Sequence, residues 1–467
     1  MSTFSGLGTA ASALAAARRG MDLAGQNVAN QLTPGYTRQR LETSAVAPPA
    51  GSTRFGPVAG QGVAVDGIAR LGDAVLDARV RDTLAASGYW SARAQAAVRA
   101  EASLAEPGKN GLADQLSQLW TAWQDLSNAP DSTAAAAAVV TRGETLVARI
   151  ADGYRSVAEQ WSSARDAAEL TVDQINAAAA EIAELNAGIR EVGVAGGSAN
   201  ELIDRRNLLA QTVARLSGAV GTVESDGTLT LRVDGNALVS GTRARELDVT
   251  GPRSIGAGEP VVLAWREPGA PPVGVSSGEL AGTLSVLAPA ESGGVLAGLA
   301  ASYNELASSL AATVNAQHRL GSTASGAPGG DFFAVAAGAP AALGLSVVPR
   351  GRDELAIAAP GAGALDGGNA DALSGIGKRS DGPDALWSDV VSRLAVATSA
   401  ESGRAARAET TAVAAAAAQQ SVAGVDNDEE TMSLLTYQTA YQAAARVLTA
   451  VDEALDVLIN RTGLVGR

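Results

Sequence analysis

The chain has 467 residues and carries 35 basic and 49 acidic side chains, a formal net charge of −14, with one histidine and no cysteine. The lack of cysteine excludes disulfides, thiolate nucleophiles and cysteine-bound zinc or iron–sulfur clusters, and a single histidine excludes multi-histidine metal sites. The acidic balance without a basic tract argues against a nucleic-acid groove, and we expect no cofactor and no nucleic-acid partner.

The first predicted element is a helix over residues 2–30. Hydrophobic side chains recur along it every seven residues, at Leu7, Leu14, Met21 and Val28. Such a repeat is typical of a helix that packs along one seam, and the sequence Thr33-Pro34-Gly35 then ends it. The apolar run over 12–17 is too short to cross a bilayer, which needs about 20 residues, so no membrane insertion is expected. Arginines follow that run instead of preceding it, which argues against a cleaved signal peptide.

A helical body is expected next. After a loop over 45–62, helical patterns cover 71–104 and 112–126, and a proline-free run over 132–192 is predicted to be one long helix. A helix capped by Asn200 follows and ends near Leu216.

The periodicity then changes from helical to alternating. Residues 228–233 alternate polar and apolar side chains between the turn sequences Asp226-Gly227 and Asp234-Gly235-Asn236, and 261–265 is a second strand candidate. Residues 218–278 are therefore predicted to form a small β-rich module inserted into a helical chain.

Helix resumes over 284–318, with breaks at Pro289 and Gly293, and loops with short strands are expected over 319–383 before another long helix reaches 422. The last helix has an apolar residue at every seam position of four heptads, at Leu434, Tyr437, Tyr441, Ala444, Leu448, Val451, Leu455 and Leu458. We expect Asp426 or Asn427 to cap it and Glu429 or Glu430 to complete a capping box. A calcium loop fits less well, because Thr431 stands where an EF-hand needs glycine.

Both ends of the chain therefore carry heptad helices. The predicted fold is mainly α and elongated, with a terminal coiled coil from 1–32 and 426–467, a helical bundle body from 33–217 and 279–425, and the inserted module 218–278. A two-helix coil with so few large side chains would be marginal alone. We therefore expect the seam residues of both helices also to form an assembly interface with other subunits.

A hydrolase is the alternative from a different class. The run 274–278 matches G-x-S-x-G with Ser276 as nucleophile, and His318 is the only candidate base. The proline-rich segment before it is a poor strand for a nucleophile elbow, so we interpret the run as a structural loop and expect no enzyme activity. A secreted coiled-coil adhesin with the β module as its binding head is a further alternative.

A specific resemblance comes from the end of the first helix. The pattern N-x-x-N-x-x-T-P-G-Y, which the chain matches at Asn27, Asn30, Thr33, Pro34, Gly35 and Tyr36, resembles the N-terminal signature of bacterial flagellar axial proteins (rod, hook and hook-associated proteins). Three further stretches, 200–209, 330–333 and 424–460, are similar to segments of the hook-associated protein 1 family.

This resemblance implies a structural component of the flagellum, needed for its assembly and for motility. Members of the family join hook to filament by forming a ring of subunits, with terminal helices lining an inner tube and β modules facing outward. The implied partners are further copies of the chain, the hook protein, a second hook–filament junction protein, an export chaperone and the type III export apparatus. The implied location is outside the cell at the hook–filament junction, reached without a cleaved signal peptide. Another axial protein, of the hook or the distal rod, is the alternative within the same class.

Overall fold

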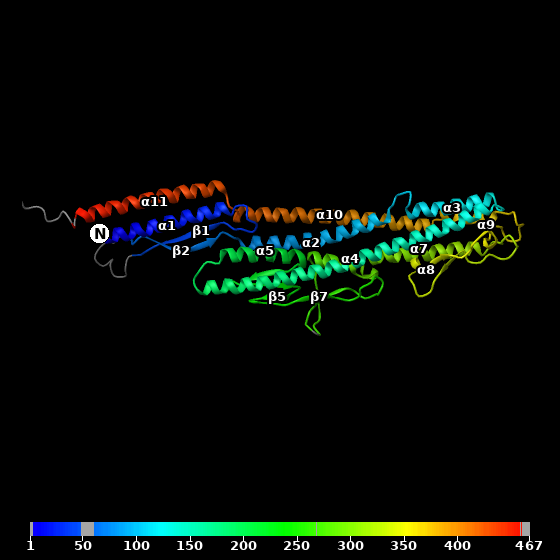
Figure 1. Ribbon diagram of the computed structural model, residues 1–467, viewed down its shortest axis with the longest axis horizontal. Helices are drawn as coiled ribbons and strands as arrows, with labels where there is room; N and C mark the ends of the chain where they lie inside the picture. Colours follow the sequence, from blue (N-terminus) through cyan, green and yellow to red (C-terminus); the bar gives the residue numbers. More distant parts are fainter. Residues whose placement is uncertain (1–2, 48–59, 268, 458, 460–467) are drawn as a thin grey trace, which may run out of the picture.

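The computed structural model describes residues 3–47, 60–267, 269–457 and 459, and it shows a long, mostly helical rod (Figure 1). One end of the rod is formed by α1 (Thr3–Ala29) and α11 (Asn427–Asp456), which lie side by side, and by the antiparallel pair β1 (Gln39–Ala45) and β2 (Val63–Arg70). We call these four elements the terminal arm. The helices match the sequence prediction, whereas the hairpin was not predicted, and the coiled-coil form of the helix pairing stays a prediction.

The rest of the rod, which we call the body, consists mainly of long helices. These are α2 (Ala74–Leu104), α3 (Leu112–Asn128), α4 (Thr133–Val194), α5 (Asn200–Ser217), α6 (Gly278–Leu287), α7 (Val295–His318) and α10 (Pro383–Ala423). Helix α4 has 62 residues and is therefore about 90 Å long, and α10 runs along α2 (Figure 1). Local caps start two of these helices: the Asp73 carboxylate accepts from the backbone of Val75, and the Ser132 hydroxyl accepts from that of Ala135.

The end of the rod opposite the terminal arm carries short elements. They are β10 (Phe333–Val335), α8 (Ala341–Gly344), β11 (Leu345–Val347) and α9 (Gly368–Ser374), with 3-10 turns at Arg352–Glu354 and Gly375–Lys378. A further 3-10 turn at Ala290–Ser292 separates α6 from α7, which confirms the predicted break near Pro289. Among the helices described, none is long and apolar enough to cross a membrane.

A β module lies along one side of α4 (Figure 1). Its first sheet pairs β3 (Val220–Val223), β4 (Leu229–Val233), β5 (Asn236–Ser240) and β6 (Arg243–Ala244), and its second pairs β7 (Leu247–Thr250), β8 (Val262–Trp265) and β9 (Pro272–Val273). Asp234 and Gly235 form the two-residue turn between β4 and β5 with φ of 47° and 80°. Positive φ at both positions is typical of a type I′ turn, and the hairpin turn predicted at this sequence is confirmed.

Two asparagines of α4 hold the module through its backbone. Asn186 accepts from the backbone N–H of Leu229 at 2.9 Å and donates to the carbonyls of Leu229 and Gly241 at 2.9 and 2.7 Å. Asn176 makes the same two-way pairing with Leu247, at 2.8 and 2.9 Å. Each side-chain amide pairs with backbone N–H and C=O groups that a neighbouring strand would otherwise bind. The two sheets are therefore attached to one helix.

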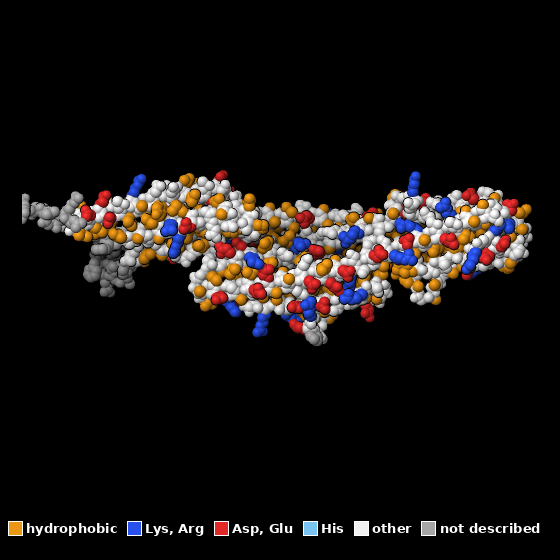
Figure 2. All heavy atoms as spheres, in the orientation of Figure 1, with side chains coloured by type: hydrophobic (Ala, Val, Ile, Leu, Met, Phe, Trp, Pro, Cys, Tyr) orange, Lys and Arg blue, Asp and Glu red, His pale blue; other side chains and the backbone are white. Residues whose placement is uncertain are grey.

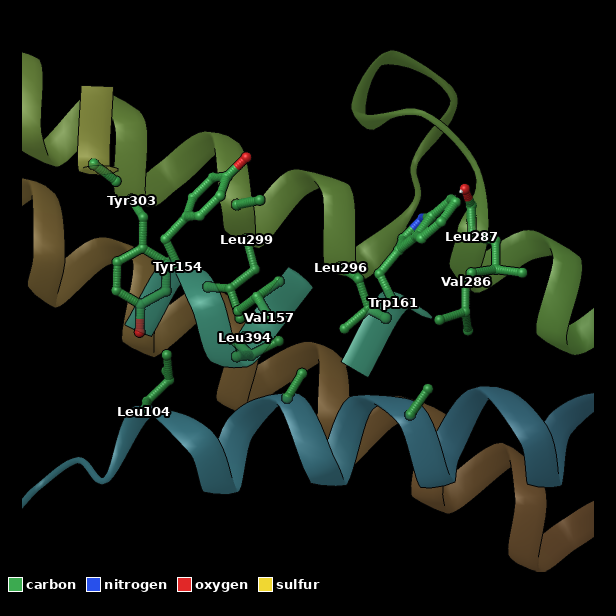
Figure 3. Packing of buried hydrophobic residues seen from close by; sticks show 14 of the residues in the cluster. Leu104, Tyr154, Val157, Trp161, Val286, Leu287, Leu296, Leu299, Tyr303 and Leu394 are labelled. Atoms are coloured by element: carbon green, nitrogen blue, oxygen red, sulfur yellow. Dashed lines mark hydrogen bonds between the residues drawn. The ribbon is translucent and has the colours of Figure 1, made fainter. Parts of the chain in front are cut away.

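One continuous hydrophobic core fills the body (Figure 3). Side chains from α2, α4, α6, α7 and α10 meet there, among them Leu104, Trp161, Leu287, Tyr303 and Leu394. Gly153 lets Tyr303 cross α4 closely, because a Cβ at this position would overlap the tyrosine ring. Of the residues described, those of the terminal arm are not members of this core.

Candidate functional site

Helix α1 meets α11 with its smallest residues. A Cβ on Gly20 would lie 2.5 Å from the ring of Tyr437, and one on Gly6 would lie 3.7 Å from Val451. The buried alanines at positions 10, 17 and 24 continue the same spacing of three and four residues. The seam of α1 therefore consists of Gly6, Ala10, Ala13, Ala17, Gly20, Ala24 and Asn27.

The seam predicted for α1 is displaced by one residue from the observed one. Leu7, Leu14 and Met21 are partly exposed and Val28 is 42% exposed. Each follows a seam residue directly, so it lies about 100° around the helix from α11. These four residues, which we call the outer stripe, place apolar side chains on the surface of the arm. The face of the arm seen in Figure 2 also carries many hydrophobic side chains.

The heptad predicted for α11 lies largely where it was expected. Its partly or fully buried members are Tyr437, Tyr441, Ala444, Leu448, Val451 and Leu455. Leu434 is 41% exposed, and Leu458 lies outside the described residues. Since Tyr437 and Val451 reach the glycines of α1, the large side chains of the seam come from α11 and the space for them from α1.

Asn27 is the buried centre of the signature sequence. Its amide nitrogen donates to the carbonyl of Gln39 at 2.9 Å and to the Glu430 carboxylate at 3.1 Å. Its amide oxygen accepts from the Gln39 backbone at 3.1 Å and from the Tyr36 hydroxyl at 2.8 Å. The first asparagine of the signature therefore ties α1 to β1, to the loop after α1 and to α11.

The other signature residues shape the turn that follows α1. The Asn30 amide donates to the carbonyl of Gln26 at 3.0 Å and accepts from the Thr33 hydroxyl at 3.2 Å. Pro34 is exposed, and Gly35 has a φ of +79°, a conformation that favours glycine. Burial raises the pKa of Tyr36 to about 12, and nearby carboxylates, first that of Asp204, add to this effect. Tyr36 is therefore a neutral hydroxyl donor at physiological pH.

Arg38 connects the signature loop to α11. Its guanidinium forms ion pairs with Glu429 and, at 2.6 Å, with the buried Glu430. Asp426 caps α11 as predicted, accepting from the backbone of Asp428 and Glu429. The capping-box prediction for the two glutamates is wrong, because both carboxylates bind Arg38, which lies in the loop after α1.

Helix α5 supplies the partners of this loop in the body. Asn200 donates to the Gln39 side chain at 3.1 Å and to the carbonyl of Ile68 at 3.0 Å. Asp204 accepts from the backbone of Thr37 at 3.0 Å and from Arg70 at 2.6 Å. The prediction that Asn200 caps α5 is wrong: Ala199 is at the N-cap, no side chain caps the helix there, and the Asn200 amide binds the arm instead. The role of Asp204 was not predicted, although both residues lie in the stretch 200–209 that shows the family resemblance.

Arg206, on the same helix, holds the β module. Its guanidinium donates to the carbonyl of Gly227 at 2.6 Å, in the turn between β3 and β4. Burial, together with the charges of Arg70 and Arg81, lowers its pKa to about 10. One face of α5 thus contacts the terminal arm, and Arg206 contacts the module.

The residues of the hydrolase alternative do not form a catalytic site. His318 is fully buried; its Nδ1 lies 2.8 Å from the carbonyl of Gly330, and its Nε2 accepts from the backbone of Ala356 at 3.0 Å. Both ring nitrogens are therefore engaged by backbone, and burial lowers the pKa of the imidazole. Ser276 is exposed in the loop between β9 and α6. Within the described ranges, histidine, aspartate and glutamate side chains form no cluster of three that could hold a metal ion.

The stretch 330–333, which shows the family resemblance, is held in place by the core of the body. The Asn315 amide accepts from the backbone of Phe332 and Phe333 at 2.8 Å and donates to the carbonyl of Phe333 at 2.7 Å. The ring of Phe332 packs against Trp123 and His318, with centroids 5.3 and 5.8 Å apart. This loop closes the core at the end of α7.

Comparison with known proteins gives two family matches. The family described as the flagellar hook-associated protein FlgK helical domain matches residues 97–333. The family described as the flagellar basal body rod FlgEFG protein C-terminal region matches residues 419–461.

The chain is also similar to individual proteins. The chain is 30% identical to flagellar hook-associated protein 1 of Bacillus subtilis, with 100% of both chains covered. It is 29% identical to flagellar hook-associated protein 1 of Escherichia coli, over 72% of this chain and 61% of that protein. A solved structure, the flagellar hook junction protein FlgK from Burkholderia pseudomallei, is 24% identical, covers 56% of this chain and 46% of its own, and has a TM-score of 0.46.

Proposed function

Because this chain belongs to the flagellar hook-associated protein 1 family, we propose that it joins hook to filament by forming a ring of subunits through its terminal helices. The observation that carries this proposal is the apolar surface of the terminal arm. Since α1 packs on α11 with glycine and alanine, the outer stripe stays at the surface, as do Met432, Leu435 and Val447 of α11. Large apolar patches of this kind are typical of protein–protein contacts.

The proposal assigns a place to each part of the chain. Residues 1–32 and 426–467 are assigned to the inner tube of the assembly, 33–217 with 279–425 to the helical domain around it, and 218–278 to an outward-facing module. The strands β1 and β2 fall within 33–217, although they lie in the terminal arm. The proposed partners are further copies of the chain, the hook protein below, a second junction protein above, and an export chaperone with the type III export apparatus. The proposed location is outside the cell, after export without a cleaved signal peptide, and the role requires no catalysis.

Electron microscopy of a deletion strain tests this function. We expect hooks without filaments and free filaments in the medium, and we expect the full chain supplied in trans to restore attachment. A chain that lacks 434–458 should be exported, as judged by immunoblot of the medium, but should fail to restore attachment. Normal filament growth with this truncated chain would show that α11 is not the assembly element. Attached filaments in the deletion strain itself would favour the adhesin alternative.

The match of residues 419–461 to the rod-protein family favours a second candidate, a hook or distal-rod protein. The two candidates differ in what the chain builds. Purified chain that polymerises into long tubes without binding filament ends would support the second candidate, whereas short rings or caps on isolated hooks would support the junction.

A further inference from the structure

Two short connections join the terminal arm to the body, and one residue binds the first residue of one connection and the residue just before the other. Residues 71–73 lead from β2 to α2, and 424–426 lead from α10 to α11. The backbone N–H of Arg38 donates to the carbonyl of Ala423 at 2.8 Å, and its carbonyl accepts from the backbone of Leu71 at 2.9 Å. The loop after α1 therefore holds the two connections together at one point.

The arm has packing of its own. Gly20 and Tyr437 join α1 to α11. The hairpin lies on another face of α1, where the Ser12 hydroxyl accepts from the backbone of Val63 at 3.4 Å. Leu23 of α1 and Leu41 of β1 are both buried. These contacts make α1, α11 and the hairpin a single unit.

The contacts between arm and body are mainly polar. Asp204 binds Thr37 and Arg70, Asn200 binds Gln39 and Ile68, and Glu201 accepts from Gln26 at 3.0 Å. An apolar contact is formed where Gly35 meets Leu208. A hydrogen bond at such an interface contributes little net stability, because water replaces the lost partner. This interface can therefore open without exposing the hydrophobic core of the body.

We propose that the terminal arm turns as one rigid unit about a polar joint at Arg38, and that Asn200 and Asp204 are the positioning residues that set its angle. The inference rests on the proposed function, because the angle of the arm decides which neighbours the outer stripe can reach. In a rigid arm the packing of α1 on α11 stays the same while the angle between arm and body changes. The same chain can therefore contact different neighbours on the two sides of the arm.

Distance measurements between spin labels test this joint, and the lack of native cysteine means that introduced cysteines are the only labelled sites. One label pair, Ala406→Cys with Gln438→Cys, spans the joint from α10 to α11, and a second, Ala15→Cys with Gln438→Cys, lies within the arm; all three positions are exposed. We expect Asp204→Ala combined with Asn200→Ala to widen the joint-spanning distance distribution at least about twofold, while the distribution within the arm keeps its width.

Arg205→Ala is the matched control. Arg205 is on the same helix, is exposed, and pairs with Glu181 of the body at 2.7 Å, so its removal should leave both distributions unchanged. Asp204→Asn keeps an acceptor for Thr37 and should give an intermediate width. An unchanged joint-spanning distribution in the double variant, or equal widening within the arm, would overturn the proposal. Filament attachment is measured separately, so a failure of the joint is distinguishable from a failure of the assembly function.

Discussion

The Glu430 carboxylate accepts a hydrogen bond from the side-chain amide of Asn27 at 3.1 Å, across a separation of 403 residues. Both side chains are almost completely buried. A buried polar group without a partner costs about 1–3 kcal/mol, so this pair favours one relative position of the first and last helices. The signature asparagine therefore binds a carboxylate near the start of α11, and Arg38 forms an ion pair with the same carboxylate.

Gly20 should be intolerant of any larger residue. In Gly20→Val the new side chain would overlap the ring of Tyr437, and such overpacking costs about 1–3 kcal/mol. We expect amide hydrogen exchange in α11 to become faster by roughly ten- to a hundredfold, because local opening of the pair becomes easier.

Gly25→Val is the control for this substitution. A Cβ at Gly25 has no heavy atom within 4 Å, so the variant makes the same helix-propensity change without the contact. Equal exchange rates in the two variants would contradict the glycine seam.

The outer stripe should matter for assembly and not for the pairing of α1 with α11. Leu14→Ser combined with Met21→Ser removes apolar surface that contributes about 1.5–3 kcal/mol per side chain when buried in a contact. We expect the double variant to lose filament attachment in the complementation assay, while amide exchange in α11 stays at the wild-type rate. Attachment at the wild-type level would remove the outer stripe from the assembly interface.

Local signals in the sequence predicted much of the body. The proline-free run over 132–192 became α4, the Asp234-Gly235 turn joined β4 to β5, and the break near Pro289 separated α6 from α7. Each of these depends on backbone preferences within a few residues. They were predictable because no distant partner is needed to decide them.

The register of α1 and the polar joint depend on distant partners. The heptad rule places the largest side chains in the seam, whereas Tyr437 requires a position with no side chain at all, at Gly20. Glu429 and Glu430 were expected to act locally, yet their partner is Arg38, which is about 390 residues away in the chain. The signature identified Asn27 but could not name Glu430 or Gln39, since no periodic pattern connects them.

Asn186 should be important for the β module. Asn186→Ala removes three hydrogen bonds to the backbone of Leu229 and Gly241 at a fully buried position. Leaving buried backbone groups unpaired costs about 1–3 kcal/mol each, so we expect a loss of roughly 3 kcal/mol in the free energy of unfolding measured with urea. Gln174→Ala, at an exposed position of the same helix, should change it by less than about 0.5 kcal/mol. A similar effect of both variants would show that α4 does not hold the module through this amide.

His318, the single histidine of the chain, should make stability depend on pH in a defined direction. Burial lowers the pKa of its imidazole in the folded chain, against the opposing effects of the hydrogen bond to the Gly330 carbonyl and of the Asp331 charge. In the unfolded chain the imidazole has a pKa of about 6.5. Below this pH the unfolded state therefore binds a proton that the folded state does not, and the free energy of unfolding falls as the pH is lowered, until the folded imidazole also titrates.

The variant His318→Gln isolates this contribution. Glutamine does not titrate, and the carboxylates of the chain are the same in the variant and the wild type. We expect the wild-type chain to be the more stable at about pH 7.5, and its advantage to shrink as the pH falls toward about 5.5, with a slope of at most about 1.4 kcal/mol per pH unit. Urea unfolding followed by tryptophan fluorescence suits the measurement, because Trp123 lies 6.1 Å from the imidazole, between ring centroids. Parallel pH profiles for the two chains would mean that the imidazole has the same pKa in the folded and unfolded states, which its burial between two backbone partners argues against.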